Sequence, residues 1–225
     1  FGVYLGEKER PEASVLLPRK QVPEGTKIGD RLTVFIYKDS EDRLIATTAV
    51  PKLEAGEVAL LKVKEITKIG AFLDMGLEKD LLLPFKEQTG KLREGEECLA
   101  ALYIDKSSRL AATMKVYPYL KTADGYKKED KVKGHVYENN ERFGVFVAVD
   151  DQYYGMIPVR EVFRNFRIGE LVEARVTKVR PDGKLDLSCR EKAYLQMDED
   201  AAMILKVLDE FDGVLPFNDK ASPEV

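Results

Sequence analysis

The sequence is poor in the side chains that most metal sites and nucleophilic enzymes need. Its 225 residues contain no tryptophan, one histidine (His135) and two cysteines (Cys98 and Cys189). One histidine and two distant cysteines fit no usual zinc spacing, and a catalytic triad would need a nucleophile beside His135 that the sequence does not indicate. We therefore expect His135 to be an ordinary strand residue and both thiols to be reduced and buried.

Other absences exclude further classes of protein. The sequence has no GxxxxGK[S/T] phosphate loop and no GxGxxG segment that opens a helix. No apolar run is long enough to span a bilayer and no signal-peptide pattern occurs, so we expect a cytoplasmic protein with no membrane partner. The acidic residues do not cluster as a metal-dependent nuclease requires. The sequence therefore predicts a protein that is not an enzyme, with no cofactor, catalytic residue or metal site.

Charge is distributed unevenly along the chain. The formal net charge is −4, from 36 basic and 40 acidic side chains. Residues 193–225 hold eight of the acids and only two of the bases, whereas the preceding segments are neutral or slightly basic. Because local patches steer a polyanion more than whole-chain charge does, this acidity does not exclude nucleic acid as a partner.

A four-part pattern occurs three times. Each copy begins with an apolar or aromatic segment around a glycine, at residues 1–5, 69–73 and 143–147. An apolar pair and a proline follow, then a glycine-acid pair, and finally a basic-apolar pair. Such self-similarity predicts three copies of one supersecondary unit. The later landmarks are Pro18, Pro84 and Pro158, then Gly29, Gly95 and Gly169, then Arg43, Arg109 and Lys184.

The repeated units have the pattern of β-structure. Alternating apolar and polar residues at 62–66 and 171–176 predict strands, and Asp182-Gly183 predicts a tight hairpin turn. Five short strands fit a closed barrel better than an open sheet, because closure removes exposed edges. The units span residues 1–50, 56–117 and 126–192, and we expect the first unit to lack its first strand because it begins at its Phe-Gly segment.

The last part of the chain has a different pattern. Residues 198–211 predict an amphipathic helix with acids in its first turn, and Asp212-Gly213 ends it. Ser222-Pro223-Glu224 then has the N-cap, proline and acid that begin another helix. A short α-helical segment is therefore expected after the three β units.

The order of the repeated motifs resembles the S1 domain of the OB-fold class. The clearest match is the third unit, with Phe143-Gly144-Val145-Phe146, then Gly169-Glu170 and Lys184-Leu185. The resemblance implies a mainly β fold of tandem five-stranded OB-fold (S1-type) barrels. Three such barrels with the Leu-Leu-Pro variant and a helical C-terminal segment resemble the conserved virulence factor B family. That family adds a C-terminal winged helix, which implies that residues 198–225 begin a truncated winged helix.

The same resemblance implies an RNA-binding platform. S1 domains stack the bases of single-stranded RNA on exposed aromatic side chains of the second strand. The matching residues are Phe143 and Phe146 in the third unit, Phe72 in the second, and Phe1 and Tyr4 in the first. Alternatively, one aromatic of each pair points into the barrel, because residues three apart in a regular strand face opposite sides. We expect the repeated glycine to mark a bulge that re-aims one of them.

Basic side chains recur near this platform. Proline replaces the histidine that often follows the apolar pair in S1 domains, and a basic residue stands two positions beyond each proline. These bases contact phosphate or, alternatively, lie at a solvated helix start. Asp39 with Arg43 and Asp105 with Arg109 are either RNA-binding positions or surface ion pairs. Phe163 and Phe166 interleave with arginines and are either stacking residues or core residues. The positively charged candidates are Lys86, Arg160, Arg164, Arg167, Arg180, Lys184, Arg109 and Arg43.

These features predict a cytoplasmic, monomeric bacterial protein that binds single-stranded RNA without catalysis. We expect it to regulate gene expression after transcription, including virulence genes. The alternative is a protein-interaction or ribosome-docking module whose barrels have lost RNA binding. Small residues give the second unit a surface that would pack on its neighbour or on a protein, namely Ala100, Ala101, Ala111 and Ala112.

Overall fold

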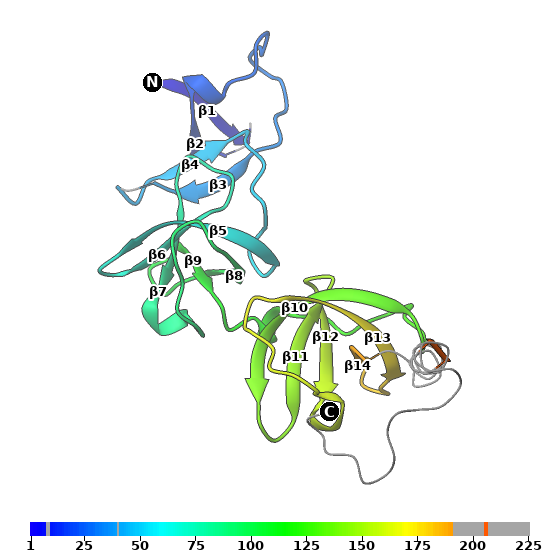
Figure 1. The fold of residues 1–225 in the computed structure, drawn as a ribbon. Helices are drawn as coiled ribbons and strands as arrows, with labels where there is room; N and C mark the ends of the chain where they lie inside the picture. Colours follow the sequence, from blue (N-terminus) through cyan, green and yellow to red (C-terminus); the bar gives the residue numbers. More distant parts are fainter. Residues whose placement is uncertain (8–9, 40, 191–204, 207–225) are drawn as a thin grey trace. The chain divides into compact units, whose positions relative to one another are not determined.

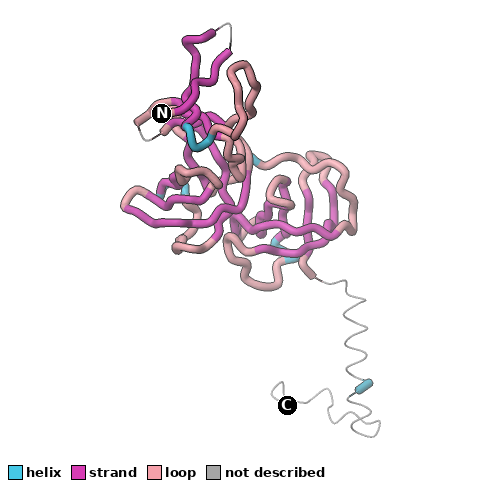
Figure 2. Tube along the Cα trace, turned by 90° about the horizontal axis from the view of Figure 1, so that it is seen from above, coloured by secondary structure: helices cyan, strands magenta, loops and turns pink. Residues whose placement is uncertain are grey.

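The computed structural model describes residues 1–7, 10–39, 41–190 and 205–206, and strands predominate among them (Figures 1 and 2). Residues 1–188 form one compact unit. The predicted winged helix at 198–225 lies outside the described residues, apart from the helical pair 205–206. The mainly β character and the small helix content expected from the sequence are confirmed.

The third repeat forms a closed barrel, which we call the third barrel. Its strand order is that of an OB fold, with β10 paired to both β11 and β13. Closure comes from a short parallel contact of β12 with β14, where Gly155 lies opposite Leu185. The strands are β10 (Lys131–Asn140), β11 (Gly144–Val149), β12 (Tyr153–Pro158), β13 (Leu171–Val179) and β14 (Leu185–Ser188).

The second repeat forms a five-stranded sheet with the same topology, which we call the second sheet. Its order is β7-β6-β5-β8-β9, and the two outer strands β7 and β9 lie beside each other. Next to them, the backbone N–H of Met114 donates to the carbonyl of Glu87 at 2.9 Å. The strands are β5 (Val58–Thr67), β6 (Gly70–Asp74), β7 (Leu81–Pro84), β8 (Glu97–Ile104) and β9 (Leu110–Thr113).

The first repeat forms a four-stranded sheet, which we call the first sheet. Its order β1-β2-β4-β3 reproduces the last four strands of the other two repeats. Among the described residues it has no strand equivalent to β5 or β10. The strands are β1 (Gly2–Glu7), β2 (Arg10–Pro18), β3 (Phe35–Lys38) and β4 (Leu44–Thr47).

The repeated glycine of the second strand is explained by a close approach, and the expected bulge at this position is wrong. A Cβ on Gly144 would lie 2.0 Å from the carbonyl oxygen of Ile157, and one on Gly70 would lie 2.3 Å from that of Leu83. The pairing of Gly144 with Asn140 and Pro158 is regular. The bulge lies one strand earlier, in β10, where Tyr137 is the extra residue between Val136 and Glu138.

The buried residues form cores within the repeats and a cluster between two of them. Strand β8 contributes to both, because its side chains alternate between its two faces. Ala100 and Leu102 belong to the core of the second sheet, whereas Leu99 and Ala101 pack with Tyr137 of the third barrel. The predicted alanine surface is therefore divided. Ala101 contacts the neighbouring barrel as expected, but Ala100 and Ala112 are core residues.

Burial also decides the state of one cysteine. Cys98 lies in the core of the second sheet, and burial raises the pKa of its thiol to about 12. A thiol with such a pKa is almost entirely protonated at neutral pH and is a poor nucleophile. Cys98 is therefore a packing residue, as the sequence predicts, whereas Cys189 is half-buried and its predicted burial is wrong.

Candidate nucleic-acid interface

A recurring corner forms where the second strand of each repeat meets the proline that ends the third. In the third barrel, Gly144 lies opposite Pro158, and the N–H of Val159 donates to the carbonyl of Phe143 at 3.1 Å. This bond holds the 3-10 helix η4 (Val159–Glu161) beside Phe143. The ring of Phe143 is 53% exposed, and Arg160 is also exposed. We call Phe143, Val159 and Arg160 the third corner.

The loop before β11 presents Phe143 in a fixed way. The side-chain oxygen of Asn140 accepts hydrogen bonds from the backbone N–H groups of both Arg142 and Phe143, each at 3.1 Å. The guanidinium carbon of Arg142 lies 5.4 Å from the centre of the Phe143 ring, within the range of a cation–π contact. An exposed ring and two cations therefore lie together at this corner.

The second corner has the same backbone but a different distribution of side chains. Gly70 lies opposite Pro84, and the 3-10 helix η2 (Phe85–Glu87) follows the proline. The position before the glycine is Ile69, and the exposed ring is instead Phe85, at 51% exposure. The motif match does not identify Phe85, because the S1 pattern places its stacking platform on aromatics of the second strand. Its place directly after the repeated proline is the signal that would have found it.

The first corner completes the pattern. Gly2 lies opposite Pro18, and the N–H of Arg19 donates to the carbonyl of Phe1 at 3.1 Å, next to the 3-10 helix η1 (Arg19–Gln21). Each corner thus presents one exposed phenylalanine and at least one exposed cation after the proline. These pairs are Phe1 with Lys20, Phe85 with Lys86, and Phe143 with Arg160.

The remaining aromatic candidates are in different environments. Phe146 lies on the outer face of β11 between two buried valines, and it is half-buried because it packs against the cluster that joins the third barrel to the second sheet. Its ring centre is 6.0 Å from that of Tyr137. Phe72 is also half-buried and pairs with Leu82, whereas Tyr4 is well exposed. Of the predicted platform, Phe1, Tyr4 and Phe143 therefore present largely open rings.

The Phe-Arg-Asn-Phe-Arg segment of the third barrel is linked internally. The guanidinium of Arg164 lies 4.0 Å from the centre of the buried Phe166 ring and pairs with Glu170 at 2.7 Å. This hydrogen bond holds the pKa of Glu170 below its usual value. Phe163 is half-exposed and meets Phe166 edge to face. Phe166 is therefore a core residue, whereas Phe163 and Arg167 face solvent.

The arginines at the last hairpin of the first two repeats, Arg43 and Arg109, both form ion pairs. Arg43 pairs with Asp39 at 2.7 Å, as predicted. The predicted pairing of Arg109 with Asp105 is wrong, because the Arg109 guanidinium reaches Asp42 of the first sheet, with Nε 2.7 Å from the carboxylate. Asp105 instead accepts the backbone N–H of Arg109 at 3.0 Å, which caps its own turn.

The two hairpin cations of the third barrel are also engaged. Arg180 pairs with Asp186 at 2.6 Å. Lys184 donates to the hydroxyl of Tyr117 at 3.3 Å and lies 5.3 Å from the ring centre of Tyr154. Tyr117 belongs to the segment that connects the second sheet to the third barrel, so Lys184 links the barrel to this segment by a hydrogen bond.

Comparisons with known proteins agree with this architecture. A model of the S1 domain matches residues 1–49 and 55–115, and a model described as "Virulence regulatory factor CvfB, second domain" matches residues 118–191. Conserved virulence factor B of Staphylococcus epidermidis is 30% identical over 223 residues, which cover 94% of this chain and 74% of the relative. The chain belongs to the conserved virulence factor B family. The protein of the same name from Staphylococcus aureus strain N315 is 28% identical over 207 residues, covering 88% and 69% of the two chains.

A solved structure shares the fold of this member of the conserved virulence factor B family. It is a multidomain protein with nucleic acid binding domains from Streptococcus pneumoniae TIGR4. The two are 23% identical with a TM-score of 0.56, and the match covers 99% of this chain and 84% of the other. The likeness extends over all three repeats and shows that the two chains share this fold.

The described residues of this conserved virulence factor B family member provide aromatic rings and cations rather than metal ligands. Within them, no helix is long and apolar enough to cross a membrane, and no three histidine, cysteine or acidic side chains gather as metal ligands. The corners instead provide flat apolar rings beside flexible cations. Such a pair can stack a base and contact the adjoining phosphate.

Proposed function

We propose that this protein binds single-stranded RNA through the corners of its S1-type repeats. The observation that carries the proposal is the recurrence of an exposed phenylalanine and an exposed cation at all three corners. Base stacking on an aromatic side chain contributes about 1–3 kcal/mol and tolerates different sequences. Three weak sites on one chain raise the overall affinity, because the second and third contacts form at high effective concentration.

The biological role proposed for this binding is post-transcriptional regulation in the cytoplasm, including that of virulence genes. Membership of the conserved virulence factor B family supports this role. The solved neighbour from Streptococcus pneumoniae, described as having nucleic acid binding domains, supports a nucleic acid as the partner. We place single-stranded RNA ahead of duplex DNA because the corners offer stacking surfaces, which a paired and stacked base cannot reach.

The test is a fluorescence-anisotropy titration of the 225-residue chain with short oligo-uridine and oligo-adenosine RNA at several salt concentrations. We expect micromolar or tighter binding that weakens steeply with salt, because each phosphate contact releases counterions. Phe143→Ala should weaken binding about tenfold, whereas Phe163→Ala, a half-exposed ring outside the corners, should not. Absence of binding at low salt would exclude the proposed function.

A second candidate is a protein-docking or ribosome-docking role, and one observation favours it. The outer face of the third barrel at Phe146 and Ala148 packs against Leu99 and Ala101 of the second sheet. An S1-type surface in this chain therefore already serves as a protein contact. If the protein has only this docking role, RNA should not bind in a salt-sensitive way, and Phe143→Ala should change nothing in the titration. The same titration therefore separates the two candidates.

A further inference from the structure

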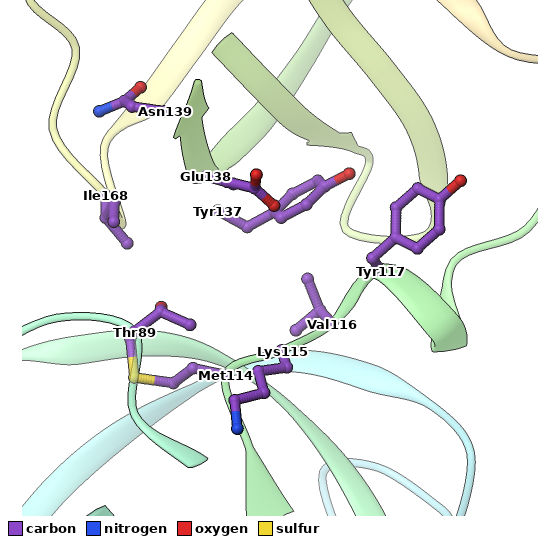
Figure 3. A pocket seen from close by; sticks show the side chains of 9 residues that line it. All are labelled: Thr89, Met114, Lys115, Val116, Tyr117, Tyr137, Glu138, Asn139 and Ile168. Carbon is purple, nitrogen blue, oxygen red and sulfur yellow. The ribbon is translucent and has the colours of Figure 1, made fainter. Parts of the chain in front are cut away.

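A cleft of about 340 Å³ lies between the second sheet and the third barrel (Figure 3). Its size falls within the range of small-ligand pockets. Figure 3 shows the Tyr137 ring and the Glu138 carboxylate on one wall, across from Met114, Lys115 and Val116 on the other. The complete lining is Thr89, Met114, Lys115, Val116, Tyr117, Tyr137, Glu138, Asn139 and Ile168.

The lining combines apolar surface with a few polar groups. Met114, Val116 and Ile168 supply apolar contact area, and Lys115 supplies a cation. Glu138 is exposed, and among the described residues no cation lies within ion-pair distance of its carboxylate. Tyr137 is only 5% exposed, and its hydroxyl has no hydrogen-bond partner within the described parts of the chain. Such a mixture suits a flat heteroaromatic ligand with polar edges better than a purely apolar one.

The bulge in β10 creates the acidic side of this cleft. Because Tyr137 is the extra residue, Val136 points into the barrel while Tyr137 turns outward onto Leu99 and Ala101. Glu138 then pairs with Phe146 and stands at the edge of the contact that Tyr137 makes. A regular strand could not place an apolar residue in the core, a ring against the neighbour and a carboxylate beside the cleft in three successive positions.

The cleft also connects two of the corners. On the second-sheet wall, Lys115 Nζ donates to the carbonyl of Lys86, which belongs to the second corner. On the opposite wall, Asn139 leads directly to Asn140, whose side chain holds the loop that presents Phe143 of the third corner. Each wall of the cleft is therefore linked to one of these two corners.

We infer that this cleft receives one base of the bound RNA and that Glu138 selects a base carrying an exocyclic amine. The inference rests on the proposed RNA-binding function and adds a position with base preference to it. A carboxylate offers only hydrogen-bond acceptors. Guanine presents an N–H and an amine that can reach both carboxylate oxygens, and adenine and cytosine each present an amine. Uracil places two carbonyl oxygens around its single N–H and meets repulsion.

The second sheet provides a matched control. Glu65 occupies the position of Glu138, because Glu65 pairs with Phe72 just as Glu138 pairs with Phe146, in both cases directly after the bulge. Glu65 is exposed like Glu138, but it does not line the cleft. Glu65→Gln therefore makes the same change in charge and shape without touching the proposed base site.

The experiment measures anisotropy of the full chain with nine-nucleotide RNAs, either all uridine or with one central guanosine, adenosine or cytidine. We expect the guanosine RNA to bind about tenfold more tightly than the all-uridine RNA, with smaller gains for the other two. Glu138→Gln should abolish the preference and leave affinity for the all-uridine RNA unchanged within about twofold, because an amide both donates and accepts. Glu65→Gln should keep the preference.

The outcomes separate the two proposals. Equal binding of all four RNAs by the unmodified protein, or a preference that survives Glu138→Gln, would overturn the base site while leaving the RNA-binding function intact. Loss of the preference in Glu65→Gln as well would show that general charge, and not the cleft, is responsible. Failure of every RNA to bind at low salt would overturn both proposals together.

Discussion

In both the second sheet and the third barrel, one extra residue interrupts the pairing of the first strand with the second. The extra residue is Lys64 in β5 and Tyr137 in β10. Lys64 projects into solvent and pairs with Asp80 at 2.7 Å. Tyr137 is buried against Leu99 and Ala101 of the neighbouring sheet. The same backbone irregularity therefore supports a solvated ion pair in one repeat and a contact between repeats in the other.

The difference shows how tandem copies of one unit acquire separate roles. The bulge and the glycine close approach are properties of the backbone and recur in both repeats. The two repeats differ in the side chain of the extra residue that the bulge directs outward. In the second sheet this residue is the charged Lys64. In the third barrel it is Tyr137, whose ring packs against the second sheet and lines the cleft.

Exchanging the two bulge residues is the strongest test of this comparison. Tyr137→Lys would place a charge against Leu99 and Ala101, and burying an unpaired charge is costly, so we expect the free energy of unfolding to fall by about 3 kcal/mol. The measurement is urea-induced unfolding followed by tyrosine fluorescence and circular dichroism.

The reverse exchange is the control. Lys64→Tyr removes an exposed ion pair and should leave the unfolding midpoint almost unchanged. Equal destabilisation by the two exchanges would show that the bulge residue has the same role in both repeats, and the comparison would be wrong.

A second prediction compares the second and third corners. The second has Ile69 and Phe85 where the third has Phe143 and Val159, so the aromatic ring has changed sides. Phe85→Val should weaken RNA binding about tenfold, and adding Ile69→Phe should restore most of the affinity by recreating the third corner. Anisotropy titrations of both variants check this. A double variant no better than Phe85→Val would mean that the corner does not act as a stacking site.

The sequence predicts the repeats well because the landmarks of the fold are local. The repeated glycine, proline and basic-apolar positions identify the strands and the S1-type topology, and the structure confirms them. Contacts between repeats were not predictable in the same way. Nothing near Arg109 in the sequence indicates that its partner is Asp42 rather than Asp105, and nothing near Tyr137 indicates a bulge. Those features depend on residues that the fold brings together from distant positions.

The residues of the candidate site could likewise be predicted from the sequence only in part. Phe143 was identified from the family pattern and is exposed as expected. Phe85 was missed because the pattern assigns stacking to the second strand alone. Phe146 fits the pattern, but the neighbouring sheet covers part of the face on which it lies. That cover depends on tertiary packing and has no signature in the sequence around Phe146.

A smaller effect is expected from the Tyr137 hydroxyl, which has no counterpart at Lys64. Burial raises the pKa of this phenol, and its oxygen has no hydrogen-bond partner among the described residues. Because an unsatisfied buried polar group is destabilising, Tyr137→Phe should raise the free energy of unfolding by about 1 kcal/mol. Urea unfolding at pH 7 measures it. Destabilisation instead would mean that the hydroxyl is hydrogen-bonded in solution.

The smallest predicted effect concerns two hairpin arginines that share a sequence pattern but not a function. The Arg109 hydrogen bond holds the pKa of Asp42 below its ordinary value of 3.8. Since the folded pKa is lowered, the stability from this pair is complete above about pH 4 and is lost as the pH falls through the folded value. Arg109→Gln should therefore lower the melting temperature slightly at pH 7, and the difference from the unmodified protein should vanish in acid.

Arg43→Gln is the matched control for this last prediction. Arg43 also lowers the pKa of its partner, Asp39, but the two residues are only four apart, whereas Arg109 and Asp42 are 67 apart. A local pair persists in part in the unfolded chain, so its loss changes stability less. Melting temperatures measured from pH 7 to pH 2.5 should show a larger and more pH-dependent effect for Arg109→Gln. Equal effects, or one independent of pH, would mean that the contact between the first and second sheets adds no stability beyond that of a local turn.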